Sequence, residues 1–157
     1  MNKKIIILLM SVMVIVLSSC GTSEKAAKEN AEEFIKLTDV YFEKQQQLMI
    51  KQSEGQSGDF AELSKHAQEV VDSKEYQEWE KEVKTIKKFK IEKGEKSEDY
   101  IKLQDSLNKY NDIQIEYFQE LAKAKDADAY NDVNTDLATK VGESQEDFFT
   151  IMEALEE

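Results

Sequence analysis

The sequence predicts an all-α protein, an antiparallel bundle of about four helices that follows a cleaved leader. Apolar residues recur every three to four positions through most of the chain, which is the spacing of amphipathic helices. No stretch alternates apolar and polar residues over a useful length, and no Asn-Gly or Asp-Gly pair marks a hairpin turn. Proline is absent, so no helix is forced to end. One-sided helices joined by short loops bury their apolar stripes most economically in a bundle.

The first residues read as an export signal and not as part of the fold. Lys3 and Lys4 form a short cationic start, and an apolar run from Ile5 to Leu17 follows, closed by two serines and Cys20. A charged start, an apolar run and a small-residue cleavage site define a signal peptide. The run is shorter than the ~20 apolar residues that span a bilayer. We therefore expect residues 1–19 to be removed.

The end of this leader, Leu17-Ser18-Ser19-Cys20, resembles the lipobox of bacterial lipoproteins. The resemblance implies that the Cys20 sulfur carries a diacylglycerol thioether and that cleavage follows Ser19. Two acyl chains meet the requirement for stable anchoring, where one chain gives only marginal binding. Cys20 is the only cysteine in the chain, and it stands where the lipobox needs it. The alternatives are a secreted protein or an uncleaved membrane anchor in which Cys20 is incidental.

The mature body is strongly acidic. It has 138 residues, the size of one domain, and a formal charge of −14 once the leader and its two lysines are removed. All basic residues are lysine, so the bidentate grip of arginine on phosphate is missing. Nucleic acid is excluded as a partner because backbone binding requires a cationic footprint. An anionic bilayer surface should also repel this body, which we expect to stand off from the membrane on a tether.

The mature chain begins with a polar tether over residues 20–30 that grades into the first helix; residues 31–157 form the bundle domain. The first helix has an apolar stripe at Ala27, Ala31, Phe34, Leu37, Tyr41 and Leu48. It stops before the glycine- and serine-rich loop 53–58. Asp59 then resembles an N-cap, with Glu62 as its capping-box partner.

The second helix slips register near Asp72-Ser73, where we expect a break or kink and a cap for a second segment. That segment carries Tyr76, Trp79, Val83 and Ile86. A loop at 93–96 precedes a long helix that we expect Ser97 to cap. Its stripe consists of Tyr100, Leu103, Leu107, Tyr110, Gln114, Tyr117 and Leu121. Another break falls around 126–128, before a last helix with Tyr130, Val133, Leu137, Val141, Phe148, Met152 and Leu155. Extended coiled-coil pairing is the alternative, because three stripes approach heptads.

Two groups of residues are candidates for a metal or catalytic site, and for each we prefer a structural interpretation. Asp132, Asn134, Asp136 and Glu143 match positions of an EF-hand calcium loop, but Leu137 replaces the required glycine and a helix stripe runs through the same residues. We therefore expect a solvated helix face there.

His66 is the only histidine, so zinc would lack its other ligands. The chain has no nucleophile-elbow motif. We predict no enzyme activity and no cofactor.

Adjacent aromatic residues are the remaining feature. Neighbours on a helix point about 100° apart, so a pair such as Phe148-Phe149 needs a wide core face or places one ring outside it. Most of these rings should be core. We expect Phe42 and Phe149 to be the outward members and to contribute to a partner-binding patch, since aromatic residues are enriched in binding hot spots.

These features predict a lipid-anchored protein on the outer face of the cell membrane. We expect it to act as a binding, scaffold or sensor module between membrane and wall and to have a protein partner in the envelope. The acidic all-helical body is similar in style to small helical lipoproteins of Gram-positive bacteria, including those described as cell-wall-binding. The alternatives are a solute-binding lipoprotein that serves a transporter and a protective surface lipoprotein of the exclusion or immunity kind.

Overall fold

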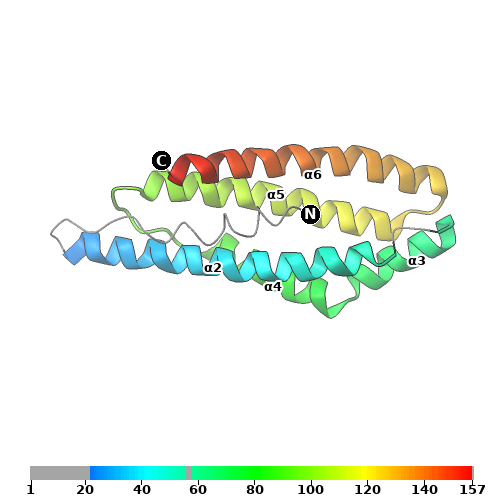
Figure 1. Cartoon of the computed structure of the whole chain (residues 1–157), viewed down its shortest axis with the longest axis horizontal. Helices are drawn as coiled ribbons and strands as arrows, with labels where there is room; N and C mark the ends of the chain where they lie inside the picture. The colour runs from blue at the N-terminus through cyan, green and yellow to red at the C-terminus, as the bar shows by residue number, and fades with distance from the viewer. Residues whose placement is uncertain (1–21, 56–57, 157) are drawn as a thin grey trace.

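Five α-helices make up the computed structural model, which describes residues 22–55 and 58–156 (Figure 1). They are α2 (Thr22–Ser53), α3 (Phe60–Val71), α4 (Lys74–Lys88), α5 (Ser97–Lys123) and α6 (Ala127–Glu156). The described residues contain no strand. The predicted all-helical bundle is confirmed, with the second helix divided in two. The signal peptide and Cys20 lie outside the described residues.

Helix α2 begins earlier than the sequence indicated. It is helical from Thr22, so most of the segment expected to be a tether belongs to the first helix. This segment contains alanine, the best helix former. Two ion pairs at i, i+4 spacing, Lys25–Glu29 and Lys28–Glu32, further support the helix there. The Asn30 side chain further holds this part of α2 to the loop before α5, donating to the Lys90 carbonyl at 3.0 Å and accepting from the Glu92 amide at 2.8 Å.

The break between α3 and α4 is a pair of helix caps. Asp59 opens α3 by accepting a hydrogen bond from the Glu62 amide at 3.1 Å, as predicted. Asp72 closes α3, and Ser73 opens α4 by accepting from the Tyr76 amide at 3.1 Å. The Asp72 amide donates to a carbonyl at the end of α3, and the Ser73 hydroxyl accepts from an amide at the start of α4. Because these groups have no partner within their own helix, the two caps let the chain turn here without glycine or proline.

The predicted cap of α5 is wrong in its detail. Lys96 occupies the N-cap position without a side-chain hydrogen bond, and Ser97 is already helical. The Ser97 hydroxyl donates to the Gly94 carbonyl at 2.9 Å and so closes the preceding turn. The predicted break at 126–128 is confirmed, since Asp126 accepts from the Ala129 amide at 2.9 Å at the start of α6.

The core is built from the predicted stripes. Trp79 is fully buried, and its ring centroid lies 5.6 Å from that of Tyr76 and 6.1 Å from that of Phe118. Other fully or almost fully buried side chains are those of Phe34, Tyr41, Leu48, Ile86, Leu107 and Phe148.

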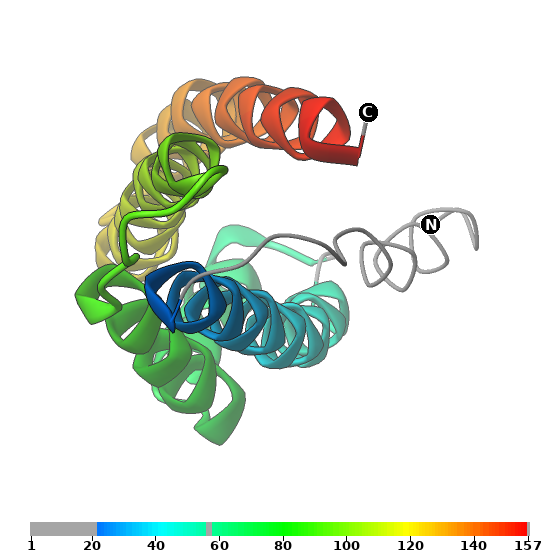
Figure 2. The same ribbon diagram turned by 90° about the vertical axis from the view of Figure 1, so that its left-hand side faces the viewer.

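The helices pack unequally. The most extensive contacts join α6 to α5, α2 to α4 and α3 to α5, and no Cα pair of α2 and α6 approaches within 8 Å. Seen from the end, the described helices follow an arc that leaves α2 and α6 as its two limbs (Figure 2).

Candidate functional site

The inner sides of α2 and α6 meet only through long side chains, over a floor supplied by α5. We call this region the α2–α6 seam and define it by Phe42, Gln45, Met49 and Gln52 of α2, Tyr110, Gln114 and Tyr117 of α5, and Asn134, Phe148 and Phe149 of α6. The backbones of α2 and α6 are too far apart for direct helix packing. The seam is therefore the part of the fold where side-chain chemistry, and not close packing, joins the helices.

A row of hydrogen bonds forms the floor of the seam. The Gln45 amide donates to the Tyr110 hydroxyl at 2.7 Å and to the Gln114 Oε1 at 3.1 Å. The Gln114 amide in turn donates to the Met49 sulfur at 3.8 Å.

A second, separate set of hydrogen bonds reaches α6. The Gln52 amide donates to the Tyr117 hydroxyl at 3.4 Å, and this hydroxyl donates to the Asn134 Oδ1 at 2.9 Å. Hydrogen bonds thus cross from α2 through α5 to α6.

Aromatic rings close the opposite end of the seam. The Phe42 and Phe148 centroids lie 5.7 Å apart, and those of Phe148 and Phe149 lie 5.5 Å apart. Phe148 is buried, whereas Phe42 and Phe149 are partly exposed. Two residues that the sequence singled out on different helices therefore flank the same buried ring. Their role in binding a partner stays a prediction.

Phe149 lies about 100° around α6 from Phe148, the residue whose ring contacts Phe42 of α2. It follows Asn134 by 15 residues, which places it about 60° around the helix from the residue bonded to Tyr117. The side chain of Asp147, which pairs with Lys109 of α5 at 3.2 Å, lies about 160° from Phe149, on the opposite flank of the same helix.

Deeper than the seam, the buried side-chain amide of Asn111 is only half satisfied within the described residues. The Tyr41 hydroxyl donates to the Asn111 Oδ1 at 2.6 Å, while the Asn111 Nδ2 is buried without a hydrogen-bond partner. Burial raises the pKa of Tyr41 well above 10, and the neighbouring Tyr110 adds to the effect. Burial also raises the pKa of Tyr110 to about 12. Both hydroxyls are therefore neutral hydrogen-bonding groups at physiological pH.

The exposed rim of the seam is acidic. Asp39 is three residues before Phe42, and Glu146 and Glu153 lie three residues before and four after Phe149, so they share faces with these rings. None of the three carboxylates forms an ion pair within the described parts of the chain. Partial burial raises the pKa of the Asp39 carboxyl.

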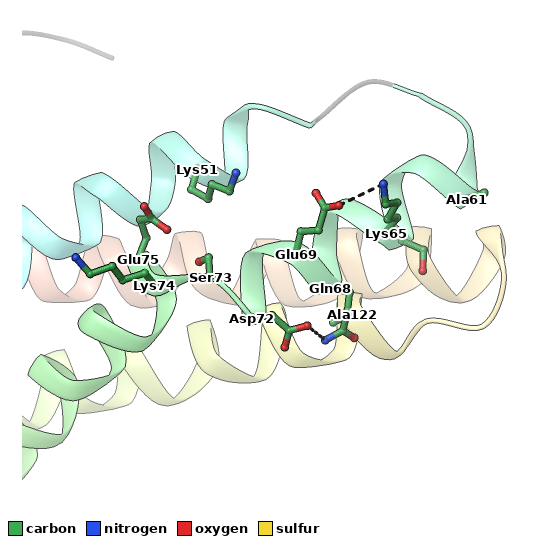
Figure 3. A pocket seen from close by; sticks show the side chains of 11 residues that line it. Lys51, Ala61, Lys65, Gln68, Glu69, Asp72, Ser73, Lys74, Glu75 and Ala122 are labelled. Atoms are coloured by element: carbon green, nitrogen blue, oxygen red, sulfur yellow. Dashed lines mark hydrogen bonds and ion pairs between the residues drawn. The ribbon is translucent and has the colours of Figure 1, made fainter.

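A second concave region lies where the end of α2, α3, the start of α4 and the end of α5 meet (Figure 3). This open hollow has a volume of about 820 Å³. Its charged lining side chains are Lys51, Lys65, Lys74, Glu69, Asp72 and Glu75.

The charges of this hollow are compensated. Lys65 pairs with Glu69 at 3.4 Å, and Gln68 donates to Asp72 at 3.0 Å (Figure 3). Lys74 pairs with Glu78 at 3.0 Å. With cations and anions alternating, the hollow offers no net charge to a ligand and no poised nucleophile.

The residues weighed for metal or catalytic roles have structural positions. Residues 132–143 are helical within α6, so the predicted helix is confirmed and an EF-hand loop does not form there. The His66 ring nitrogen Nε2 lies 3.0 Å from the Gln52 carbonyl and joins α3 to the end of α2. A Cβ on Gly55 would clash with the His66 ring, so the imidazole fills the space that glycine leaves. Within the described residues, no three His, Cys, Asp or Glu side chains cluster as metal ligands.

The polar floor of the seam is the feature that sequence reasoning missed. The one signal was Gln114, a polar residue in the apolar stripe of α5. Its partner Gln45 lies 69 residues away and between two expected stripe positions of α2, so only the packing of the helices brings the two amides together.

Comparison with protein-family models, curated protein sequences and solved structures gave no match to this chain. None of the helices within the described residues is both long and apolar enough to cross a bilayer.

Proposed function

We propose that this protein is a lipid-anchored binding module on the outer face of the cell membrane, with a protein partner in the cell envelope. The observation that carries the proposal is the lone cysteine at the end of Leu17-Ser18-Ser19-Cys20. Acylation of Cys20 and cleavage after Ser19 fix the location, and the acidic helical body supplies the binding surface. A scaffold or sensor of this kind needs neither cofactor nor catalytic group.

The start of α2 favours an anchor that holds the bundle close to the membrane. Only Gly21 separates Cys20 from the first helical residue, Thr22. The end of the bundle that holds the start of α2 would therefore be proximal to the bilayer. Phe42 is 20 residues farther along the helix, about 30 Å from that end. This distance would place the aromatic part of the seam above the membrane surface, within reach of another envelope protein.

The helix arrangement also fits the predicted four-helix design. We propose that α3 and α4 together occupy one position of an antiparallel bundle, with α2, α5 and α6 in the other three. Such a body presents long continuous helix faces, and these faces suit protein recognition better than small-molecule chemistry.

Metabolic labelling tests the anchor. Cells grown with radiolabelled palmitate should yield this polypeptide carrying label in the membrane fraction. Cys20→Ala should carry no label and leave that fraction, whereas Ser18→Ala, which keeps a small residue ahead of the cysteine, should behave as wild type. Unlabelled wild-type protein, or Cys20→Ala retained at the membrane, would refute the proposal.

A further inference from the structure

We propose that the α2–α6 seam is a docking site for a cationic amphipathic helix supplied by another protein. This inference rests on the proposed function and names the class of partner. The two limbs of the arc, α2 and α6, have no Cα pair within 8 Å of each other, so their inner sides do not pack directly against one another within the described residues. The arc opens on that side in the end view (Figure 2).

The seam has the dimensions and chemistry that helix recognition needs. From Phe42 to Gln52 it extends for about 15 Å, or three helical turns. Partly exposed apolar side chains are present at Phe42, Met49 and Phe149, and the exposed fraction of Met49 is 41%. Amphipathic helices bind such surfaces through apolar residues at i, i+3, i+4 and i+7.

The negative charge of the rim favours a positively charged partner. The three rim carboxylates, those of Asp39, Glu146 and Glu153, have no ion pair within the described residues. Asp39 is in addition partly desolvated, with a raised pKa. A lysine or arginine on the flank of a docked helix would pair with these groups and relieve that cost.

Most lysines of the two limbs lie away from the seam or are already paired. Lys140 lies nine residues before Phe149, on the opposite side of α6, and Lys36 is about 120° around α2 from Phe42. Lys44 and Lys51 are paired with Glu78 and Glu54, respectively. Lys36 is three residues before Asp39 and so lies beside one rim carboxylate, but no ion pair joins the two within the described residues.

The same charges disfavour a second copy of this chain. Two seams facing each other would bring together acidic rims on bodies that each carry a net charge of −14. Like charges across an interface oppose association. An anionic or neutral helix would gain the apolar contacts but not the ion pairs.

Photo-crosslinking with a defined peptide tests the proposal. The probe is an amphipathic peptide of about 14 residues made of leucine and lysine, with one photoreactive residue on its apolar face. The controls are a leucine–glutamate peptide of the same pattern and a leucine–lysine peptide with shuffled order. The full chain is held in nanodiscs of zwitterionic lipid, and crosslinked sites are mapped by mass spectrometry.

Two variants locate the site. Phe149→Ala removes an apolar contact, and the triple variant Asp39→Asn, Glu146→Gln, Glu153→Gln removes the rim charge. The matched control removes three exposed carboxylates away from the seam, with Asp105→Asn, Glu116→Gln and Asp136→Asn. Circular dichroism and thermal midpoints establish that each variant is folded.

The expected result is saturable labelling of α2 and α6 by the leucine–lysine peptide, about tenfold weaker in Phe149→Ala and in the rim variant and unchanged in the control variant. Three results would overturn the proposal: equal loss in the rim and control variants, labelling by the leucine–glutamate peptide as strong as that by the leucine–lysine peptide, or a chain that is dimeric by sedimentation. The proposed anchor is tested separately by palmitate labelling, so its failure is distinguishable from failure of the docking site.

Discussion

The two sides of α2 differ in what joins them to the rest of the molecule. Toward α4, the helix packs closely against a side that carries Trp79, Val83 and Ile86, all buried. On the side toward the seam, it reaches α5 through glutamine side chains and α6 through one partly exposed phenylalanine. The first side has the density of a core, and the second is held by hydrogen bonds that a partner could supplement. Stability should therefore depend mainly on the α4 side and recognition on the α6 side.

The largest loss of stability is expected on the side of α2 that packs against α4. Trp79→Ala removes a fully buried indole that contacts Tyr76 and Phe118, which should cost about 3–5 kcal/mol of unfolding free energy. Urea denaturation followed by circular dichroism measures it. A loss below about 1 kcal/mol would show that this side is not the stabilising one.

Alkaline pH should weaken the floor of the seam. The pKa of Tyr110 is raised by burial to about 12 in the folded chain, against 10 for an unperturbed tyrosine. The folded state thus holds its proton more tightly, so this contribution to stability is intact below pH 10 and is lost as pH rises through 12. The loss should reach roughly 2 kcal/mol at pH 12.

Comparison with Tyr110→Phe isolates this contribution from other titrating groups. The variant should be less stable than wild type at pH 8, because the bond from Gln45 is lost, and the difference should shrink above pH 10. Denaturation curves at pH 8 and pH 11 provide the test. A constant difference between the two proteins would argue against a buried, neutral Tyr110.

A smaller cost is expected at the aromatic end of the seam. Phe149→Ala removes a partly exposed ring that rests on Phe148, and the unfolding free energy should fall by about 1 kcal/mol while the helices persist. Thermal unfolding compared with Trp79→Ala measures the difference between the two sides of α2. If Phe149→Ala unfolds the domain, Phe149 belongs to the core and not to a binding surface.

The smallest predicted change in stability is a gain. Gly142 is exposed in the middle of α6, and an added Cβ would meet nothing within 4 Å. Gly142→Ala should therefore stabilise the chain by roughly 0.5–1 kcal/mol, because alanine loses less backbone freedom in a helix. A raised thermal midpoint would confirm this, whereas a lowered one would show that something packs against this position.

Much of the fold could be predicted because its causes are local. Buried stripe positions such as Tyr41, Trp79 and Phe148 follow from helical spacing, and the cap at Asp59 follows from side-chain chemistry within three residues. The start of α2 and the role of Ser97 were mistaken because each depends on contacts with the loop before α5.

The candidate site could be predicted only in part. Phe42 and Phe149 stood out as members of aromatic pairs, but nothing in their spacing showed that the two helices would bring them to one ring, that of Phe148. The hydrogen-bonded floor joins residues 65–69 positions apart, such as Gln45 and Gln114, and that pairing depends on which helix faces meet.

Binding measured on a pair of variants tests most directly whether α2 has one stabilising and one recognising side. Val83→Ala truncates a buried side chain on α4, and Phe149→Ala truncates a partly exposed one on α6. Labelling by the leucine–lysine peptide should be unchanged in Val83→Ala, although that chain is less stable, and about tenfold weaker in Phe149→Ala. Equal weakening in both variants, or weakening in Val83→Ala alone, would contradict the account.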